Sequence, residues 1–269
     1  MPAVNIVWFR FLFAALGLFL YYLIFQPRKL AIFKKPPLLA LIAALGLSLN
    51  YFGFSTGLHL TSPNTAQVVI QLGPILLGII GFVVYKERIA KMQIIGFAFA
   101  FIGLSVFYLN QIEGMLEAKA NLFNQGFLWI AAAALGWTLY AALQKHLVKS
   151  FDTQLLNLLI FTVPAILFIP FVDFSFFAPL TLGQWLLMIF LGMNTIIAYG
   201  FIALAFKYTQ VNKVSVVISL NPILTFLAMT VLYYIDVQWI ETSLMGMTTF
   251  FGALLVIAGA IFVVQFRKR

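Results

Sequence analysis

The sequence predicts an all-α membrane protein in which nine transmembrane helices form two inverted repeats. Three observations predict this class. The 269-residue chain is 64% hydrophobic and only 9% charged, whereas soluble domains carry about 25% charged residues. Its apolar runs are long enough to cross a bilayer as helices, which takes about 20 residues each. A segment of the first half also recurs in the second half.

Apolar runs separated by charged or Pro- and Gly-containing breaks are each expected to form one transmembrane helix. They cover residues 5–26, 38–58, 64–85, 92–109, 126–144, 154–172, 184–206, 211–234 and 243–266. A transmembrane barrel would instead need strands of roughly ten residues with alternating polarity, and these runs are apolar throughout. So many helices leave no room for a soluble catalytic domain or an ATP-binding domain.

The basic residues indicate how the chain is oriented. Fourteen of the sixteen Lys and Arg residues fall in alternate loops or at the carboxyl end. Because cytoplasmic loops retain positive charge, we expect the loops at 27–37, 86–91, 145–153 and 207–213 and the C-terminus to lie in the cytoplasm of a bacterium, with the protein in its inner membrane. Lys119 is expected on the opposite side, and Arg10 lies within the first span. The net charge of +9 is therefore a topology signal, and no nucleic-acid partner is expected.

No metal site and no cofactor are expected. The chain has no cysteine, which excludes disulfides and Cys-ligated metals. His59 and His146 fall at helix ends on opposite sides of the predicted membrane, so they are not expected to share a metal ion.

The internal repeat relates residues 57–76 to residues 205–224 at an offset of 148, and nine of the twenty aligned positions are identical. Shared hydropathy does not explain the identical pairs Asn64/Asn212 and Pro74/Pro222. In the next span the offset is 156, and the recurring glycines are the pairs Gly96/Gly252 and Gly103/Gly259.

The two copies of the repeat are expected to be inverted relative to each other. The loop after the 64–85 span is basic, whereas the loop after the 211–234 span is acidic, with Asp236 and Glu241. By the charge rule these equivalent loops lie on opposite sides of the membrane. Inverted repeats with a site near the midplane are a common plan of secondary transporters.

We divide the chain into a first repeat of four helices at residues 1–110 and a second repeat of five helices at residues 111–269. The 126–144 span has no partner in the first repeat, because the offset of 148 would place that partner before Met1. A plan of five plus five helices is therefore expected, with a further hydrophobic segment of about 20 residues encoded upstream of Met1.

Several of these features resemble the drug/metabolite transporter superfamily, specifically its EamA-type members, over nearly the whole chain. The resemblance is carried by Trp8-Phe9-Arg10-Phe11, the T…N…V…L.P stretch ending at Pro74, the Lys86-Glu87-Arg88 turn and the recurring glycines. It implies ten helices in two inverted halves and transport of small metabolites, often the export of amino acids. The chain departs from the family in lacking the first helix and in having Ile235 where a second Glu would match Glu87.

Polar residues inside the spans are the candidates for a substrate cavity, because such groups generally face the bundle interior or a wet cavity. Two of them, Gln67 and Gln71, share one helix face with Pro74 at spacings of four and three residues. Their partners in the repeat are Ser215, Ser219 and Pro222. The other spans contribute Asn50, Tyr51, Trp137, Tyr140, Asn194 and Tyr199. Pro74 and Pro222 are expected to bend their helices.

Each candidate also has a purely structural interpretation. Ser and Gln residues often do no more than hydrogen-bond between helices, and a proline can kink a helix without binding anything. Arg10 can snorkel to the interface, bond to another helix or bind a substrate carboxylate. Glu87 is expected to cap a helix rather than to form a gating ion pair.

The leading hypothesis is a secondary transporter that exports small metabolites, such as amino acids, across the plasma membrane by alternating access. The expected partners are a small-molecule substrate and the lipid bilayer, with the chain as a monomer or a homodimer. No enzyme activity and no catalytic residue are expected, because the sequence has no P-loop, no HExxH motif and no Ser/His/Asp set. The alternatives are an intramembrane lipid-processing enzyme and a channel or non-transporting scaffold.

Overall fold

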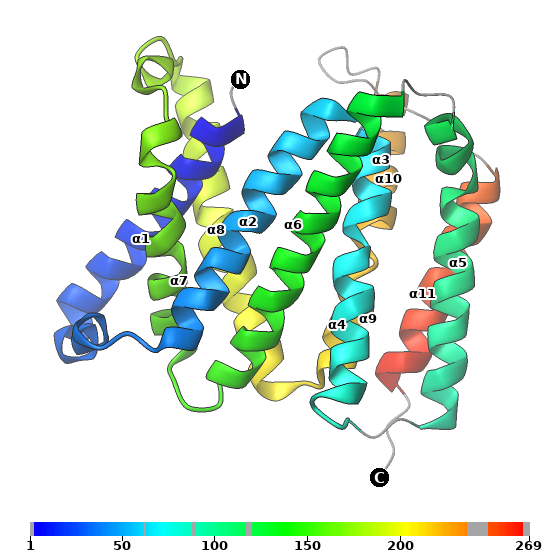
Figure 1. The fold of residues 1–269 in the computed structure, drawn as a ribbon, viewed down its shortest axis with the longest axis horizontal. Coiled ribbons are helices and arrows are strands. Elements are labelled where there is room, and N and C mark those ends of the chain that lie inside the picture. The colour runs from blue at the N-terminus through cyan, green and yellow to red at the C-terminus, as the bar shows by residue number, and fades with distance from the viewer. Residues whose placement is uncertain (1–2, 62, 88–89, 117–119, 236–246, 266–269) are drawn as a thin grey trace. The chain divides into compact units, whose positions relative to one another are not determined.

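The computed structural model is all-helical in the part of the chain that it describes, which is residues 3–61, 63–87, 90–116, 120–235 and 247–265 (Figure 1). No strand occurs in these ranges, in agreement with the predicted all-α class. Four of the described helices are long and apolar enough to cross a membrane, at Val4–Phe25, Leu38–Leu60, Gln125–Leu147 and Leu182–Tyr208, and four more are apolar but shorter. The number of nine spans stays a prediction.

The first of two compact units comprises Met1–His59 and Leu128–Thr209. Its helices are α1 (Ala3–Phe25), α2 (Leu38–Leu60), most of α6 (Ala120–Leu147), α7 (Thr153–Leu167) and α8 (Leu182–Tyr208). Short 3-10 helices lie between them, namely η1 (Pro27–Lys34), η2 (Ile169–Phe171) and η3 (Phe174–Phe177). Within this unit α1 packs against both α7 and α8.

The second unit comprises Leu60–Phe127 and Gln210–Arg269. Its helices are α3 (Pro63–Ile70), α4 (Leu72–Val83), α5 (Lys91–Leu116), α9 (Val211–Ile218), α10 (Asn221–Tyr234) and α11 (Met247–Gln265). Each compact unit therefore takes helices from both of the sequence repeats predicted above.

Two of the predicted spans are each interrupted in the structure. The 64–85 span is divided into α3 and α4 after Ile70, and the 211–234 span into α9 and α10 after Ile218. Each break falls four residues before a proline, Pro74 or Pro222. A proline has no N–H to bond the carbonyl four residues earlier, and its ring crowds that carbonyl. The sequence position of the proline therefore accounts for the position of each break.

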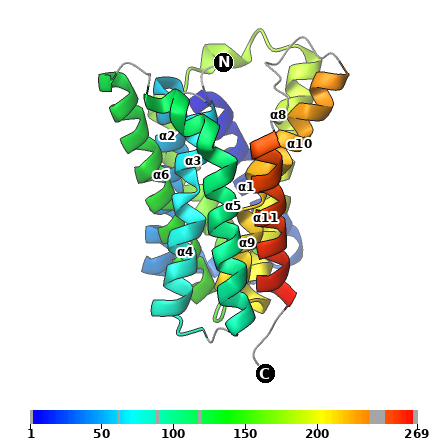
Figure 2. The same cartoon turned by 90° about the vertical axis from the view of Figure 1, so that its right-hand side faces the viewer.

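Glycines bring α5 and α11 of the second unit into close contact, and Figures 1 and 2 both show these helices side by side. A Cβ atom on Gly96 would lie 2.8 Å from the carbonyl oxygen of Gly259, and one on Gly103 would lie 2.8 Å from that of Gly252. Small residues allow such approach between membrane helices. Each glycine thus contacts a glycine other than its own partner in the repeat, because the two helices cross antiparallel.

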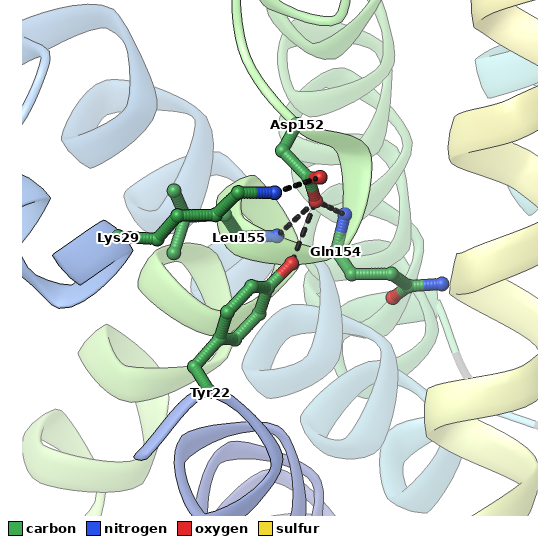
Figure 3. A network of polar contacts seen from close by, with 5 residues as sticks. All are labelled: Tyr22, Lys29, Asp152, Gln154 and Leu155. Carbon is green, nitrogen blue, oxygen red and sulfur yellow. Dashed lines mark hydrogen bonds and ion pairs between the residues drawn. The ribbon is translucent and has the colours of Figure 1, made fainter. Parts of the chain in front are cut away.

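Asp152 fixes the start of α7 and connects it to α1. Its Oδ1 accepts hydrogen bonds from the backbone N–H groups of Gln154 and Leu155 at 3.1 and 3.2 Å, which is the usual arrangement of a helix N-cap. The same oxygen accepts one from the Tyr22 hydroxyl at 2.6 Å, and Oδ2 pairs with Lys29 Nζ at 2.9 Å (Figure 3). Partial burial by itself would raise the pKa of Asp152, but the hydrogen bonds outweigh it and lower the pKa to about 2.

A lysine of α6 binds the carboxyl end of α8. Lys145, in the last turn of α6, donates hydrogen bonds from Nζ to the carbonyl oxygens of Phe206 at 2.7 Å and Thr209 at 2.6 Å. A cation at a helix C-terminus satisfies carbonyls that lack helical partners and favourably meets the helix dipole. Lys145 therefore stabilises the end of α8.

Candidate functional site

Three tyrosines of the first unit lie together and are named here the tyrosine cluster: Tyr51 of α2, Tyr140 of α6 and Tyr199 of α8. The Tyr199 hydroxyl donates a hydrogen bond to the Tyr51 hydroxyl at 3.1 Å. The rings of Tyr140 and Tyr199 meet edge to face with centroids 5.7 Å apart. Tyr140 and Tyr199 are buried, and Tyr51 is half-buried. All three were predicted cavity residues, and the structure brings them together.

Two phenylalanines hold this cluster in place. Phe11 of α1 lies edge to face on Tyr51 with centroids 4.8 Å apart, and Phe161 of α7 does the same on Tyr199 at 5.6 Å. The two phenylalanines also contact each other, at 5.9 Å. Such aromatic pairs are each worth about 0.5–1.5 kcal/mol beyond the area that they bury. All five helices of the unit therefore contribute an aromatic ring to one group of packed rings.

Arg10 lies beside the tyrosine cluster, on α1. Its Nε donates a hydrogen bond to Thr195 Oγ1 of α8 at 3.1 Å, and its guanidinium carbon lies 5.6 Å from the centre of the Tyr51 ring. Arginine has five N–H donors, and the remaining four have no hydrogen-bond acceptor within the described ranges. Arg10 thus bonds another helix, and its terminal amino groups stay available to a bound anion.

The hydroxyl of Tyr140 is a second unused hydrogen-bonding group. The residue is 0% exposed, and its oxygen finds no partner within the described ranges. A buried polar group left unpaired costs about 1–3 kcal/mol, so such groups are rare in folded proteins and call for an explanation. A polar molecule bound against the tyrosine cluster would supply one.

The other predicted cavity residues of the first unit differ in their surroundings. Asn50 donates a hydrogen bond from Nδ2 to the carbonyl oxygen of Ala133 at 2.9 Å, and so connects α2 to α6. Trp137 is half-buried on α6, whereas Asn194 is exposed on α8. The contact of Asn50 is therefore a hydrogen bond between helices, as its structural interpretation expects.

Thr195 is a site residue that the sequence reasoning missed. It lies next to the predicted Asn194, but it is buried and receives the hydrogen bond from Arg10. Its spacing from Tyr199 is four residues, which places both on one face of α8. That spacing is the signal in the sequence that would have added Thr195 to the candidates, and Asn194 stays a prediction.

In the second unit, the predicted serines use their hydroxyls within the protein. Ser215 Oγ donates a hydrogen bond to the carbonyl oxygen of Pro74, and so joins α9 to α4. Ser219 Oγ donates to the carbonyl oxygen of Ser215 at 3.0 Å. Gln71 is buried at the break between α3 and α4, and Gln67 is half-buried on α3.

Ser215 and Ser219 also line a cavity of about 210 Å³ within the second unit. The rest of its lining is apolar, including Ile75, Phe82 and Phe97. Since both hydroxyls already have acceptors, this cavity presents few free polar groups. It is less suited to a charged ligand than the surroundings of Arg10.

Glu87 caps a helix that lies far from it in the sequence. Its carboxylate, in the connection between α4 and α5, accepts hydrogen bonds from the backbone N–H groups of Val211 at 2.7 Å and Asn212 at 3.1 Å. These are the first two residues of α9, where unpaired N–H groups and the helix dipole favour a negative charge. The expected capping role is confirmed, and the capped helix is α9.

The described residues contain no group of three or more His, Asp or Glu side chains arranged for a metal ion. The first unit brings together a cation, hydroxyls and aromatic rings, at Arg10 and the tyrosine cluster.

Comparison with known proteins gives a consistent result. The model of the EamA-like transporter family matches residues 1–109 and 124–265. An uncharacterized transporter of Haemophilus influenzae is 32% identical over 263 residues, covering 97% of this chain and 85% of its own. The uncharacterized inner membrane transporter YhbE of Escherichia coli is 29% identical, over 96% of this chain and 81% of its own.

A more distant relative and a solved structure agree with these matches. The uncharacterized transporter YxxF of Bacillus subtilis is 25% identical over 86% of this chain and 74% of its own. A crystal structure that is 20% identical superposes with a TM-score of 0.75, over 98% of this chain and 88% of its own. At that identity the likeness concerns the fold alone.

Proposed function

The chain belongs to the EamA-like transporter family, and on this premise we propose that it is a secondary transporter that exports small metabolites by alternating access. It is a multi-pass membrane protein of the bacterial inner membrane, as its apolar helices and its inner-membrane relative indicate. The substrates that we propose are small molecules with a carboxylate, such as amino acids.

The observation that carries the proposal is the arrangement of Arg10 beside the tyrosine cluster. A guanidinium group within a membrane span is costly, and such groups commonly mark substrate pathways. Its free N–H groups match the geometry of a carboxylate, which it can bind through two parallel hydrogen bonds. The rings of Tyr51, Tyr140 and Tyr199 would contact the apolar part of the same substrate, and the Tyr140 hydroxyl would bond a polar group on it.

Alternating access is supported by the internal repeat. The helix breaks before Pro74 and Pro222 occur at equivalent positions of the two sequence copies. Interrupted helices in corresponding positions of two halves are typical of secondary transporters, whose sites lie at such breaks. Gln67, Gln71, Ser215 and Ser219, next to these breaks, stay predicted cavity residues.

We propose that the substrate's own concentration gradient drives transport, as facilitated export or as exchange. Proton-coupled transporters commonly use Asp, Glu or His within their spans as relays. The predicted spans contain no Asp or Glu, and Glu87 and Asp152 are occupied in helix capping.

The C-terminus and the basic loops are proposed to be cytoplasmic. The chain has no cysteine, so labelling of single introduced cysteines would test this orientation.

The experiment that tests the function is a metabolite-export screen in cells that express the chain. We expect one or more amino acids or other small carboxylates to accumulate in the medium. Arg10→Gln should abolish this accumulation at equal membrane abundance, whereas Lys91→Gln, at an exposed position at the start of α5, should leave it unchanged. Equal export by cells with and without the protein would contradict the proposal.

A further inference from the structure

An apolar groove runs along the first unit between α1 and α7, which lie side by side in Figure 1. It has a volume of about 290 Å³, and its lining includes Leu12, Leu16 and Phe19 of α1 and Ile166 of α7. From Leu12 to Phe19 the helix rises by about 10 Å, so the groove follows a substantial part of the span. Leu16 is 50% exposed and Ile166 63% exposed, so the groove is open along its outer edge.

The groove offers almost no hydrogen-bonding groups. Its one polar lining residue is Thr162, whose hydroxyl donates to the carbonyl oxygen of Leu158 at 2.7 Å. A polar metabolite would therefore find no hydrogen-bond donor here, and burying it would cost free energy. An acyl chain makes no such demand.

At one end the groove meets a basic segment, through Phe33, which lines it from η1. This segment carries Arg28, Lys29, Lys34 and Lys35, all exposed. Lys29 pairs with Asp152 (Figure 3). The other three have no carboxylate partner within the described ranges, so the segment has a local excess of positive charge.

We propose that this groove and segment form a binding site for an anionic phospholipid. One acyl chain lies along α1 and α7, and the phosphate headgroup lies against Arg28, Lys34 and Lys35. Basic residues immediately beside a membrane helix attract anionic lipids, and the apolar groove accommodates an acyl chain of the same molecule. The site is separate from Arg10 and the tyrosine cluster, and it does not depend on the proposed transport.

The test is native mass spectrometry of the full chain in detergent, titrated with phosphatidylglycerol or with phosphatidylcholine of the same acyl chains. We expect one phosphatidylglycerol to bind at least about tenfold more tightly than phosphatidylcholine, and added salt to reduce that preference. Equal affinity for the two lipids would overturn the proposal. So would loss of phosphatidylglycerol binding in millimolar glycerol phosphate, because the headgroup alone would then be the ligand.

Two pairs of variants locate the site. The double variant Lys34→Gln/Lys35→Gln should lower the affinity for phosphatidylglycerol about tenfold. The double variant Lys91→Gln/Lys207→Gln removes the same charge from other exposed positions and should leave this affinity unchanged. Leu16→Trp fills the groove and should weaken both lipids, while Leu20→Trp, at a 53% exposed position outside the groove, should weaken neither. Equal effects within either pair would place the lipid elsewhere and refute the assignment.

Discussion

The hydroxyl of Tyr199 donates a hydrogen bond to the hydroxyl of Tyr51, 3.1 Å away and 148 positions distant in the sequence. That separation equals the offset of the internal repeat. In the proposed inverted arrangement of the two copies, residues at equivalent positions meet on a pseudo-two-fold axis, where transporters with such an arrangement bind their substrates. The pair therefore joins the sequence repeat to the proposed site.

Replacing Tyr199 by Phe removes the donor of this hydrogen bond and keeps the ring. This hydrogen bond fixes the Tyr51 ring beside Arg10. If the bound substrate loses about 1 kcal/mol because that ring is no longer fixed, its apparent affinity should fall about fivefold. The measurement is the concentration dependence of transport at equal membrane abundance. Tyr208→Phe, on the same helix but 77% exposed, is the matched control, and an equal effect of both changes would argue against the pair.

Glu87→Ala should destabilise the protein, because two backbone N–H groups of α9 lose their acceptor. The expected loss is about 1–2 kcal/mol, which is typical of a removed N-cap, measured as a lower melting temperature in detergent. Glu87→Gln keeps one acceptor oxygen and should lose less. Unchanged stability of the Ala variant would mean that the cap contributes nothing.

Gly96→Ala should also destabilise, since its Cβ would lie 2.8 Å from the carbonyl oxygen of Gly259 and from Cβ of Phe262. Overpacking of this kind costs about 1–3 kcal/mol. Gly183→Ala is the control, because nothing lies within 4 Å of a Cβ there and alanine favours the helix. If the two variants unfold alike, the close contact of α5 and α11 is not tight in solution.

The stability that Asp152 supplies should depend on pH. Its pKa in the folded protein is about 2, below the ordinary value of 3.8, so the charged carboxylate stabilises the fold above about pH 4. This contribution should be lost as the pH falls from about 4 through 2. Because the side chain is 38% exposed, solvent screens the pair and the effect is modest.

The check on Asp152 is the melting temperature of the native protein and of Asp152→Asn between pH 2 and pH 7. The variant should be the less stable of the two at pH 7, and the difference should shrink toward pH 2. A difference that does not vary with pH would contradict the role of the charge.

Much of the fold could be predicted from the sequence, because hydropathy and helix breakers act locally. The apolar runs correspond to helices, and the breaks in two of them fall four residues before Pro74 and Pro222. Gly96 and Gly103 were identified in the sequence only as parts of the repeat, and the structure adds that they lie where α5 closely contacts α11, as small residues allow between membrane helices.

The contacts that depend on distant partners were beyond such reasoning. The acceptor for Val211 N–H is Glu87, 124 positions away, and the donor to Asp152 is Tyr22, 130 positions away. Likewise, nothing in the sequence distinguished Asn50, which bonds to the Ala133 carbonyl, from a residue that faces a substrate. A polar side chain in a span needs a partner, but the sequence does not name it.

The most direct test of the central claim is counterflow in proteoliposomes that contain only this chain and lipid. The vesicles are loaded with unlabelled amino acids, and the entry of a radiolabelled amino-acid mixture is measured without ATP, with and without an imposed pH gradient. We predict protein-dependent entry that needs no ATP and no pH gradient, and that falls at least about tenfold in Arg10→Gln, because the carboxylate loses a charged hydrogen-bonding partner. No entry above that of protein-free vesicles, or equal entry with Arg10→Gln, would contradict the account.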